Sequence, residues 1–343
     1  MKPGLKALYL SGAHHLLAPF SRGMGIIFML HRVSPEKPDA FSPNAGLTVT
    51  PSYLDSVLRD VRAAGLDIVS LDEARERLIS GKKGRRFACF TLDDGYRDNL
   101  EHAFPVFSKH GAPFTIYVPS DFPDGKGELW WVALEEIIKR KAKLEITGWG
   151  ISESIAAGTV DEKHHAFDSL YEMLRECGED EQRERIGELA ARHDVDMEKI
   201  CRELIMTWDE IRQLASEPLA TIGAHTVAHY AVARLPEDRA RNELKHGADR
   251  LAEELGRRPD HLSFPYGDAE SAGPRDFRLA EELGFKTAVT TRKGLLFEEH
   301  ASHLTALPRV SLNGAYQSEL FTRLYLSGAP FALWNRFRKV DAA

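Results

Sequence analysis

Short apolar runs alternate with amphipathic segments along most of this 343-residue chain, and this alternation constrains the fold more than any other feature. The predicted strands are residues 25–30, 67–70, 87–92, 114–118, 220–223, 261–264, 287–290 and 307–310. The predicted helices between them are residues 52–64, 71–79, 99–110, 208–215, 237–255 and 274–283. Strands that alternate with helices form parallel sheets, because each helix returns the chain to the start of the next strand. Eight such units favour an α/β fold with a distorted or incomplete (β/α) barrel.

The regular pattern breaks between residues 126 and 205, where the chain is charged and rich in predicted helix, most clearly over 161–177 and 179–193. No Gly/Pro/Ser-rich tract flanks this stretch, so we interpret it as a helical insertion between two barrel strands. The insertion either caps a substrate cleft or is a passive excursion. We therefore expect an N-terminal helical segment (1–24), a barrel with its insertion (25–313) and a C-terminal helical segment (314–343).

One short sequence occurs near both ends of the chain. Leu-Tyr-Leu-Ser-Gly at residues 8–12 recurs at residues 324–328, and aromatic, apolar and basic residues follow each copy. The simpler interpretation is that two terminal helices pack on the barrel. The alternative is an interfacial pair that makes peripheral contact with a membrane.

Composition excludes several classes of protein. Lys and Arg number 45 against 52 Asp and Glu, a net charge of −7, so we expect no nucleic-acid partner. Three cysteines without a CxxC pair indicate neither a disulfide framework nor a thiolate zinc cluster. Residues 1–21 make a poor secretory signal, and no apolar stretch is long enough to span a membrane. We expect a cytoplasmic protein, with the inner face of the membrane as an alternative location. The sequence does not predict an oligomeric state.

Two motifs carry ligands for a metal. Asp93 and Asp94 end the 87–92 strand in Thr-Leu-Asp-Asp-Gly, where two adjacent carboxylates are costly unless a metal or a proton offsets their repulsion. His225 and His229 follow the 220–223 strand in His-Thr-Val-Ala-His, a spacing that lets both imidazoles reach one ion. Each motif alone is a weak signal. Together Asp94, His225 and His229 form the three-ligand open site typical of hydrolytic zinc enzymes.

Three further residues end predicted strands. His31 follows the 25–30 strand, Arg309 lies in the 307–310 strand, and Tyr266 follows the 261–264 strand in Phe-Pro-Tyr-Gly-Asp. The Pro-Tyr-Gly sequence is either a simple β-turn or a turn that aims a backbone N–H at a developing oxyanion. Parallel barrels build active sites at the carboxyl ends of their strands. The placement of these residues therefore predicts a metal-dependent hydrolase.

These motifs resemble those of the polysaccharide deacetylase family, also called NodB-type or carbohydrate esterase family four. TLDDG is similar to its TFDDG motif, HTVAH to H-[ST]-x-x-H, and FPYG to R-x-P-Y-G. The resemblance implies a (β/α) barrel, Asp93 as general base, and a divalent metal, most often zinc, on Asp94, His225 and His229. It also implies that the backbone N–H of Tyr266 helps to stabilise the oxyanion.

Two positions depart from the family pattern. Ser263 occupies the place of the arginine that steadies the catalytic base, and we expect Arg309 to replace it. The late L-x-H motif, which supplies the catalytic acid, has no clear match, although His303 lies near it. A subgroup with permuted motifs uses an early histidine instead, and His31-Arg32 resembles that arrangement. We predict that His31 is the acid, with His303 in reserve.

The resemblance implies removal of N-acetyl groups from amino sugars of a polysaccharide, oligosaccharide or glycolipid precursor. Deformylation or other amide hydrolysis on a lipid-linked sugar or a cyclic amide is an alternative, because a fold does not fix its substrate. A catalytically silent glycan-binding protein is a second alternative. The presence of a base beside the metal ligands argues against a pure binder.

Overall fold

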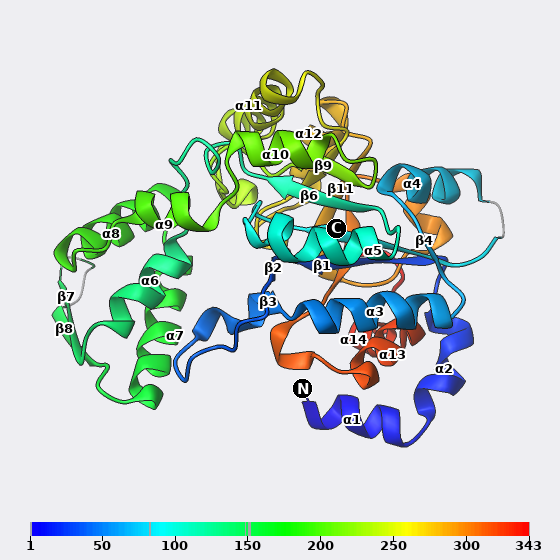
Figure 1. Ribbon diagram of the computed structural model, residues 1–343, viewed down its shortest axis with the longest axis horizontal. Helices are drawn as coiled ribbons and strands as arrows, with labels where there is room; N and C mark the ends of the chain where they lie inside the picture. Colours follow the sequence, from blue (N-terminus) through cyan, green and yellow to red (C-terminus); the bar gives the residue numbers. More distant parts are fainter. Residues whose placement is uncertain (1, 82–83, 148, 150–151, 343) are drawn as a thin grey trace.

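Seven parallel strands form a closed barrel in the structure, a computed structural model that describes residues 2–81, 84–147, 149 and 152–342 (Figure 1). The ring order is β1 (Gly25–Leu30), β12 (Leu307–Ser311), β11 (Thr287–Lys293), β10 (His261–Ser263), β9 (Ala220–Ala224), β6 (Phe114–Val118) and β5 (Phe87–Leu92). β5 pairs with β1 along its whole length and closes the ring. The predicted α/β barrel is confirmed. Residues 1 and 343 of the predicted terminal segments, and residues 148, 150 and 151 of the predicted insertion, lie outside the described residues.

The eighth predicted strand does not join the ring. β4 (Asp67–Ile68) pairs only with the first two residues of β5, Phe87 and Ala88, outside the closed barrel. The predicted strand continued to Ser70, but the Ser70 side chain accepts a hydrogen bond from the Glu73 N–H and caps the next helix. The strand therefore ends at Ile68, and the chain enters helix α4 at Leu71.

Burial on both faces of the sheet explains why continuous apolar runs predicted the strands well. Every residue of β1, β5 and β6 is buried, as expected of parallel strands covered on both faces. Alternate residues of β1 face opposite sides. Ile26 and Phe28 belong to the cluster that includes the surrounding helices, whereas Ile27 clusters with Cys89 of β5 and Tyr117 of β6.

The surrounding helices follow the predicted ranges closely. They are α3 (Pro51–Ala63), α4 (Leu71–Ser80), α5 (Phe104–Lys109), α10 (Trp208–Ala215), α11 (Glu237–Leu255) and α12 (Pro274–Glu282). The helix predicted over 99–110 begins instead as a π-helical turn, Asn99–Ala103, ahead of α5. Pro105 has no N–H to donate, so a regular α-helical bond at that position is impossible.

The insertion forms a second core beside the barrel (Figure 1). Its elements are α6 (Trp130–Lys139), β7 (Lys143–Thr147), β8 (Ser152–Ala156), α7 (Val160–Glu176), α8 (Glu179–Arg192) and α9 (Met197–Leu204). The insertion is rich in helix, as predicted, but it also contains the antiparallel β7–β8 hairpin, which was not predicted. Its alternation is short, with only Leu144 and Ile146 of β7 buried, so the sequence carries a weak strand signal there.

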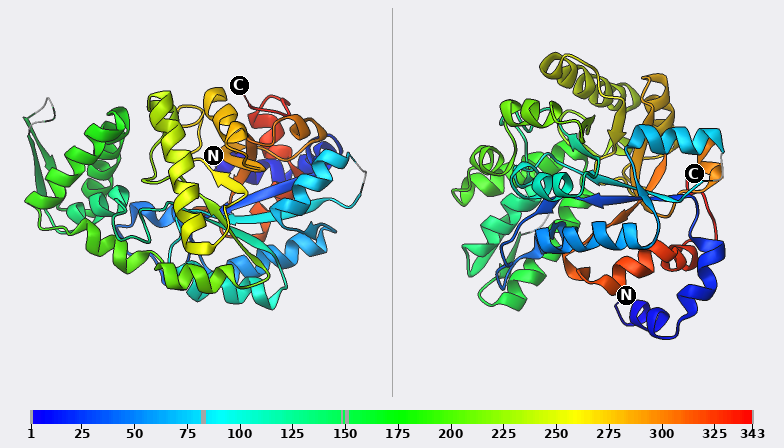
Figure 2. Two further views of the ribbon diagram at one scale, coloured as in Figure 1. Left: turned by 90° about the horizontal axis from the view of Figure 1, so that it is seen from above. Right: turned by 45° about the vertical axis from the view of Figure 1, so that its right-hand side comes forward.

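The two ends of the chain pack together on one side of the barrel (Figure 2). α1 (Lys2–Leu10) and α2 (Ala13–Ser21) contact α13 (Glu319–Ser327), α2 also contacts α14 (Ala329–Trp334), and α13 contacts α3. The Ser21 hydroxyl donates to the carbonyl of Ser327 at 2.7 Å. Gly328 approaches so closely that a Cβ there would lie 2.0 Å from the Ser21 carbonyl oxygen. None of the described helices is long and apolar enough to cross a membrane.

Candidate active site

The side chains of the three candidate metal ligands, Asp94, His225 and His229, converge where β5 and β9 end. The Oδ1 atom of Asp94 lies 3.5 Å from His225 Nε2 and 3.3 Å from His229 Nε2. All three residues are buried, and their ligand atoms lie within 4.8 Å of one another. No other group of His, Cys, Asp and Glu in the described part of the chain meets this criterion. The sequence motifs thus meet in space.

Local backbone geometry aims these side chains. Asp94 has φ 74° and His229 has φ 60°, left-handed values that are rare for residues other than glycine. The His229 N–H donates to Thr226 Oγ1 at 3.0 Å, and Thr226 itself has φ 65°. Glu243 of α11 accepts hydrogen bonds from the Val227 and Ala228 N–H groups at 3.1 and 3.0 Å. These contacts hold residues 225–229, which we call the histidine loop, in a backbone conformation that costs free energy on its own.

The three side chains fit a divalent cation. Asp94 Oδ1 is buried without a hydrogen-bond partner among the described residues. Nδ1 of His225 lies 2.6 Å from the Ser263 carbonyl and donates to it, which leaves the Nε2 lone pair facing Asp94. Burial lowers the pKa of His229 to about 4, so its imidazole is neutral at pH 7. A neutral imidazole is the protonation state in which a histidine binds a metal.

Asp93 is held by Arg309. Nη1 and Nη2 of Arg309 donate to Oδ1 and Oδ2 of Asp93, each at 2.7 Å. The other donors of the guanidinium bond to Thr91 Oγ1, Ser263 Oγ and the Thr290 carbonyl. Burial alone would raise the pKa of Asp93, but the Arg309 charge and hydrogen bonds reverse this and lower it. The carboxylate is therefore ionised at neutral pH. That Arg309 takes part in catalysis stays a prediction.

Tyr266 joins the barrel to the insertion. Its ring packs edge-on against His229, with centroids 4.9 Å apart, and its hydroxyl accepts from Trp130 Nε1 at 2.8 Å. Its φ is 59°, and Thr291 Oγ1 donates to its carbonyl oxygen at 2.6 Å. The Tyr266 N–H has no hydrogen-bond acceptor among the described residues. It is therefore available to a substrate oxygen, although its role stays a prediction.

His31 and His303 lie in different places. His31 is half-buried at the end of β1 and lines one cavity together with Asp93, Asp94, His225, His229 and Tyr266. His303 is exposed and precedes β12, and its neighbour Leu304 accepts from the Ala288 N–H near the start of β11. This is the amino end of the barrel, opposite the cavity. The reserve role of His303 is therefore wrong on geometric grounds, while the role of His31 as acid stays a prediction.

The insertion caps the cavity, which has a volume of about 450 Å³. Trp131 of α6 and four residues of α7 form its outer wall: Phe167, Asp168, Tyr171 and Glu172. Of the two interpretations of the insertion, the structure shows the cap. Sequence reasoning missed these wall residues. Their signal was the spacing of Phe167 and Tyr171, with Asp168 and Glu172, on one predicted helix, which an ordinary packed helix also shows.

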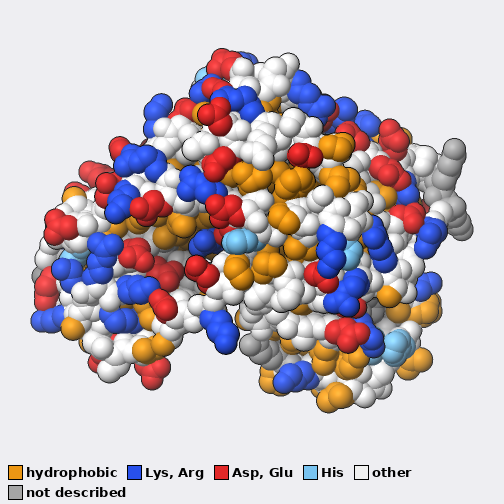
Figure 3. All heavy atoms as spheres, in the orientation of Figure 1, with side chains coloured by type: hydrophobic (Ala, Val, Ile, Leu, Met, Phe, Trp, Pro, Cys, Tyr) orange, Lys and Arg blue, Asp and Glu red, His pale blue; other side chains and the backbone are white. Residues whose placement is uncertain are grey.

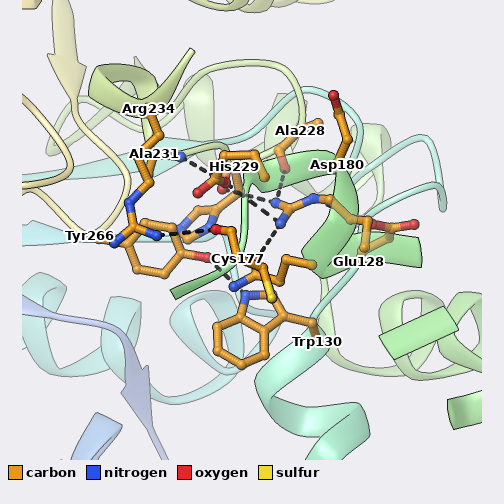
Figure 4. A network of polar contacts seen from close by, with 12 residues as sticks. Glu128, Trp130, Cys177, Asp180, Ala228, His229, Ala231, Arg234 and Tyr266 are labelled. Carbon is orange, nitrogen blue, oxygen red and sulfur yellow. Dashed lines mark hydrogen bonds and ion pairs between the residues drawn. The ribbon is translucent and has the colours of Figure 1, made fainter. Parts of the chain in front are cut away.

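Side chains of helix α8 form hydrogen bonds with the backbone of Ala228, His229 and Ala231 (Figure 4). Arg183 Nη2 donates to the carbonyl oxygens of Ala228 and His229 at 3.1 and 3.2 Å. Glu179 accepts from the Ala231 N–H at 3.1 Å and lies 3.7 Å from Arg183. Both side chains are buried. No sequence pattern predicts this role, because a Glu and an Arg four residues apart usually form an exposed helical pair.

Comparisons with known proteins agree with this geometry. The family model for polysaccharide deacetylase matches residues 80–288, more than half of the chain. The Streptococcus pyogenes deacetylase PplD in complex with acetate is similar in structure, with a TM-score of 0.58, 17% identity, and 88% of this chain and 97% of that chain covered. IcaB from Ammonifex degensii gives a TM-score of 0.55 at 17% identity, with 89% and 97% covered. At these identities the likeness shows the fold alone. No curated protein matches the sequence.

Proposed function

The chain belongs to the polysaccharide deacetylase family and is a hydrolase of acetyl amide bonds, and from this premise we propose that it is a metal-dependent N-deacetylase of amino sugars. Its substrate would be a polysaccharide, an oligosaccharide or a glycolipid precursor. One observation carries the proposal. The Asp94–His225–His229 cluster lies beside an ionised, arginine-bound Asp93 in a single cavity.

The residues of the cavity have different roles in the proposed amide hydrolysis. A divalent cation held by Asp94, His225 and His229, with zinc as our first choice, would supply Lewis acidity toward water and the acetyl carbonyl. Asp93 takes the proton of the attacking water. Arg309 keeps that carboxylate ionised and fixes its orientation, since both of its oxygens accept from one guanidinium. The base is therefore in place before the substrate arrives.

Two other groups act on the carbonyl oxygen and on the nitrogen. The Tyr266 N–H donates to the carbonyl oxygen as it gains negative charge. His31 gives a proton to the amide nitrogen as the C–N bond breaks, so that acetate and a free amine are released. His31 suits this step because it lines the same cavity as Asp93 and Asp94.

The walls of the cavity support a sugar as substrate. Trp131, Phe167 and Tyr171 present aromatic surface on the side of the insertion, and Asp168 and Glu172 add carboxylates that accept hydrogen bonds from hydroxyls. Apolar walls with a few placed polar groups are typical of small-molecule sites.

Acetate release tests the proposal. Metal-reconstituted protein is incubated with N-acetylated amino-sugar oligosaccharides of increasing length and with the N-formyl forms of the same sugars. We expect acetate release from at least one acetylated sugar, and none from an Asp93→Asn variant that retains its metal. Equal acetate release by that variant would refute the assignment of the base. Formate release alone would refute the acetyl group as the substrate.

A further inference from the structure

Large apolar side chains are exposed on the terminal helices. Leu10, Leu16 and Phe20 of α1 and α2 are 80%, 78% and 77% exposed. Leu333 and Trp334 of α14, and Phe337 just beyond it, are also exposed. We call these six residues the terminal patch. Only two other large hydrophobic residues in the described part of the chain are exposed, Ile79 and Val160. Apolar exposure is therefore concentrated where the two chain ends meet.

The helices that carry the terminal patch are neighbours. α2 packs against both α13 and α14, so residues from the first 20 positions lie beside residues from the last 15. Figure 3 shows hydrophobic side chains gathered at the lower right of that face, where Figure 1 places α1 and α2. Leu16 and Phe20 are one helical turn apart and share a face of α2. An exposed apolar cluster of this kind marks an interaction surface.

The two chain ends that carry the terminal patch are rich in basic residues, of which Lys339 pairs with Glu299 at 2.6 Å. Residues 1–24 contain Lys2, Lys6 and Arg22 but no Asp or Glu, and residues 328–340 contain Arg336, Arg338 and Lys339 but no acid. These two stretches carry +6 in a chain of net charge −7, so the remainder carries −7 − 6 = −13. These two stretches are therefore basic while the rest of the chain is acidic. Basic side chains beside exposed apolar ones suit a surface of anionic lipid headgroups.

We propose that the terminal patch docks on the surface of a bilayer that contains anionic lipids. Leu16, Phe20 and Trp334 enter the boundary between headgroups and acyl chains, and the basic residues contact the phosphates. A second copy of this chain fits the surface less well. A two-fold interface would bring like-charged basic stretches against one another, and neither stretch contains an acidic residue of its own.

The docked protein would hold its catalytic cavity away from the lipid. α2 leads into the amino end of β1, whereas the cavity lies at the carboxyl ends of the strands. A six-residue strand spans about 20 Å, so the barrel separates the two sites by at least its own height. This consequence rests on the proposed function. It favours, as substrate, sugars that extend from the membrane over those next to the bilayer.

Vesicle flotation tests the docking. Full-length protein is mixed with vesicles of phosphatidylcholine alone or of phosphatidylcholine with phosphatidylglycerol. We expect the protein to float with the mixed vesicles only, and to bind less as salt shortens the screening length. Leu16→Ser/Phe20→Ser protein should bind at least about tenfold more weakly, because two apolar anchors are lost. Arg336→Glu/Arg338→Glu protein should lose the preference for phosphatidylglycerol.

Ile79→Ser/Val160→Ser protein is the matched control, since it removes two exposed apolar side chains elsewhere and should bind as wild type does. Circular dichroism and acetate release from a soluble substrate show that each variant is folded, and vesicle binding is read out independently of catalysis. Three results would overturn the proposal: wild-type protein that does not float with either vesicle, equal loss of binding in the control, or a lipid-free dimer that Leu16→Ser/Phe20→Ser dissociates.

Discussion

Arg309 and Asp93 form a bidentate ion pair with two hydrogen bonds of 2.7 Å. The pair joins two strands that are not neighbours in the barrel. Arg309 belongs to β12 and Asp93 follows β5, and β1 lies between them in the ring. The pair therefore spans β1 and links residues 216 positions apart in the sequence. A strand near the end of the chain thus fixes the orientation of the proposed base.

Replacing Arg309 with methionine should destabilise the protein and inactivate it. The variant leaves a buried carboxylate without its partner, so we expect the free energy of unfolding to fall by about 3–5 kcal/mol in urea denaturation. Asp93→Asn/Arg309→Met should recover part of that loss, because no unpaired charge stays buried. Arg323→Met, which removes an exposed pair with Glu319, should leave the free energy of unfolding nearly unchanged. Equal losses in the two arginine variants would contradict the assignment.

The metal content of variant proteins should distinguish the role of Asp94 from that of Asp93. Asp94→Ala removes a ligand and should abolish both bound metal, measured by elemental analysis, and acetate release. Asp93→Asn should retain the metal while losing activity, because Asp93 bonds to Arg309 and lies outside the ligand cluster. Removal of the metal with a chelator should also lower the melting temperature of wild-type protein, since a ligand that binds only the native state stabilises it. Full metal content in Asp94→Ala would rule out the site.

The acid role of His31 predicts a specific kinetic change. His31→Ala should lower kcat by about 10²–10⁴-fold, the usual contribution of general acid catalysis, while the bound metal remains. The activity lost should recover in part with substrates whose amine leaves more easily, because such a leaving group needs less protonation. His303→Ala is the matched control and should have normal activity, since His303 lies at the opposite end of the barrel. Near-normal turnover of His31→Ala would remove His31 from the mechanism.

The sequence predicted the barrel well because its strands are buried on both faces and read as continuous apolar runs. It also placed Asp94, His225 and His229 together, because the carboxyl ends of parallel strands meet at one end of a barrel. It missed that β4 stays outside the ring, since the capping role of Ser70 competes with strand pairing. It missed Arg183 and Glu179 because their burial depends on how the insertion folds against the histidine loop. No local pattern encodes a contact of that kind.

Arg183 should therefore tune metal affinity without touching the metal. Its guanidinium holds the carbonyl oxygens of Ala228 and His229, and so it fixes the loop that positions one metal ligand. Arg183→Ala should weaken metal binding by about 10–100-fold, the usual effect of losing a group that orients a ligand, and calorimetric titration of the metal-free protein would measure it. Arg185→Ala, which loses an ion pair with Glu181 and a cation–π contact with Trp149 but no contact with the histidine loop, should bind metal as wild type does. If Arg183→Ala kept full metal affinity but became less stable, Arg183 would serve only to dock the insertion.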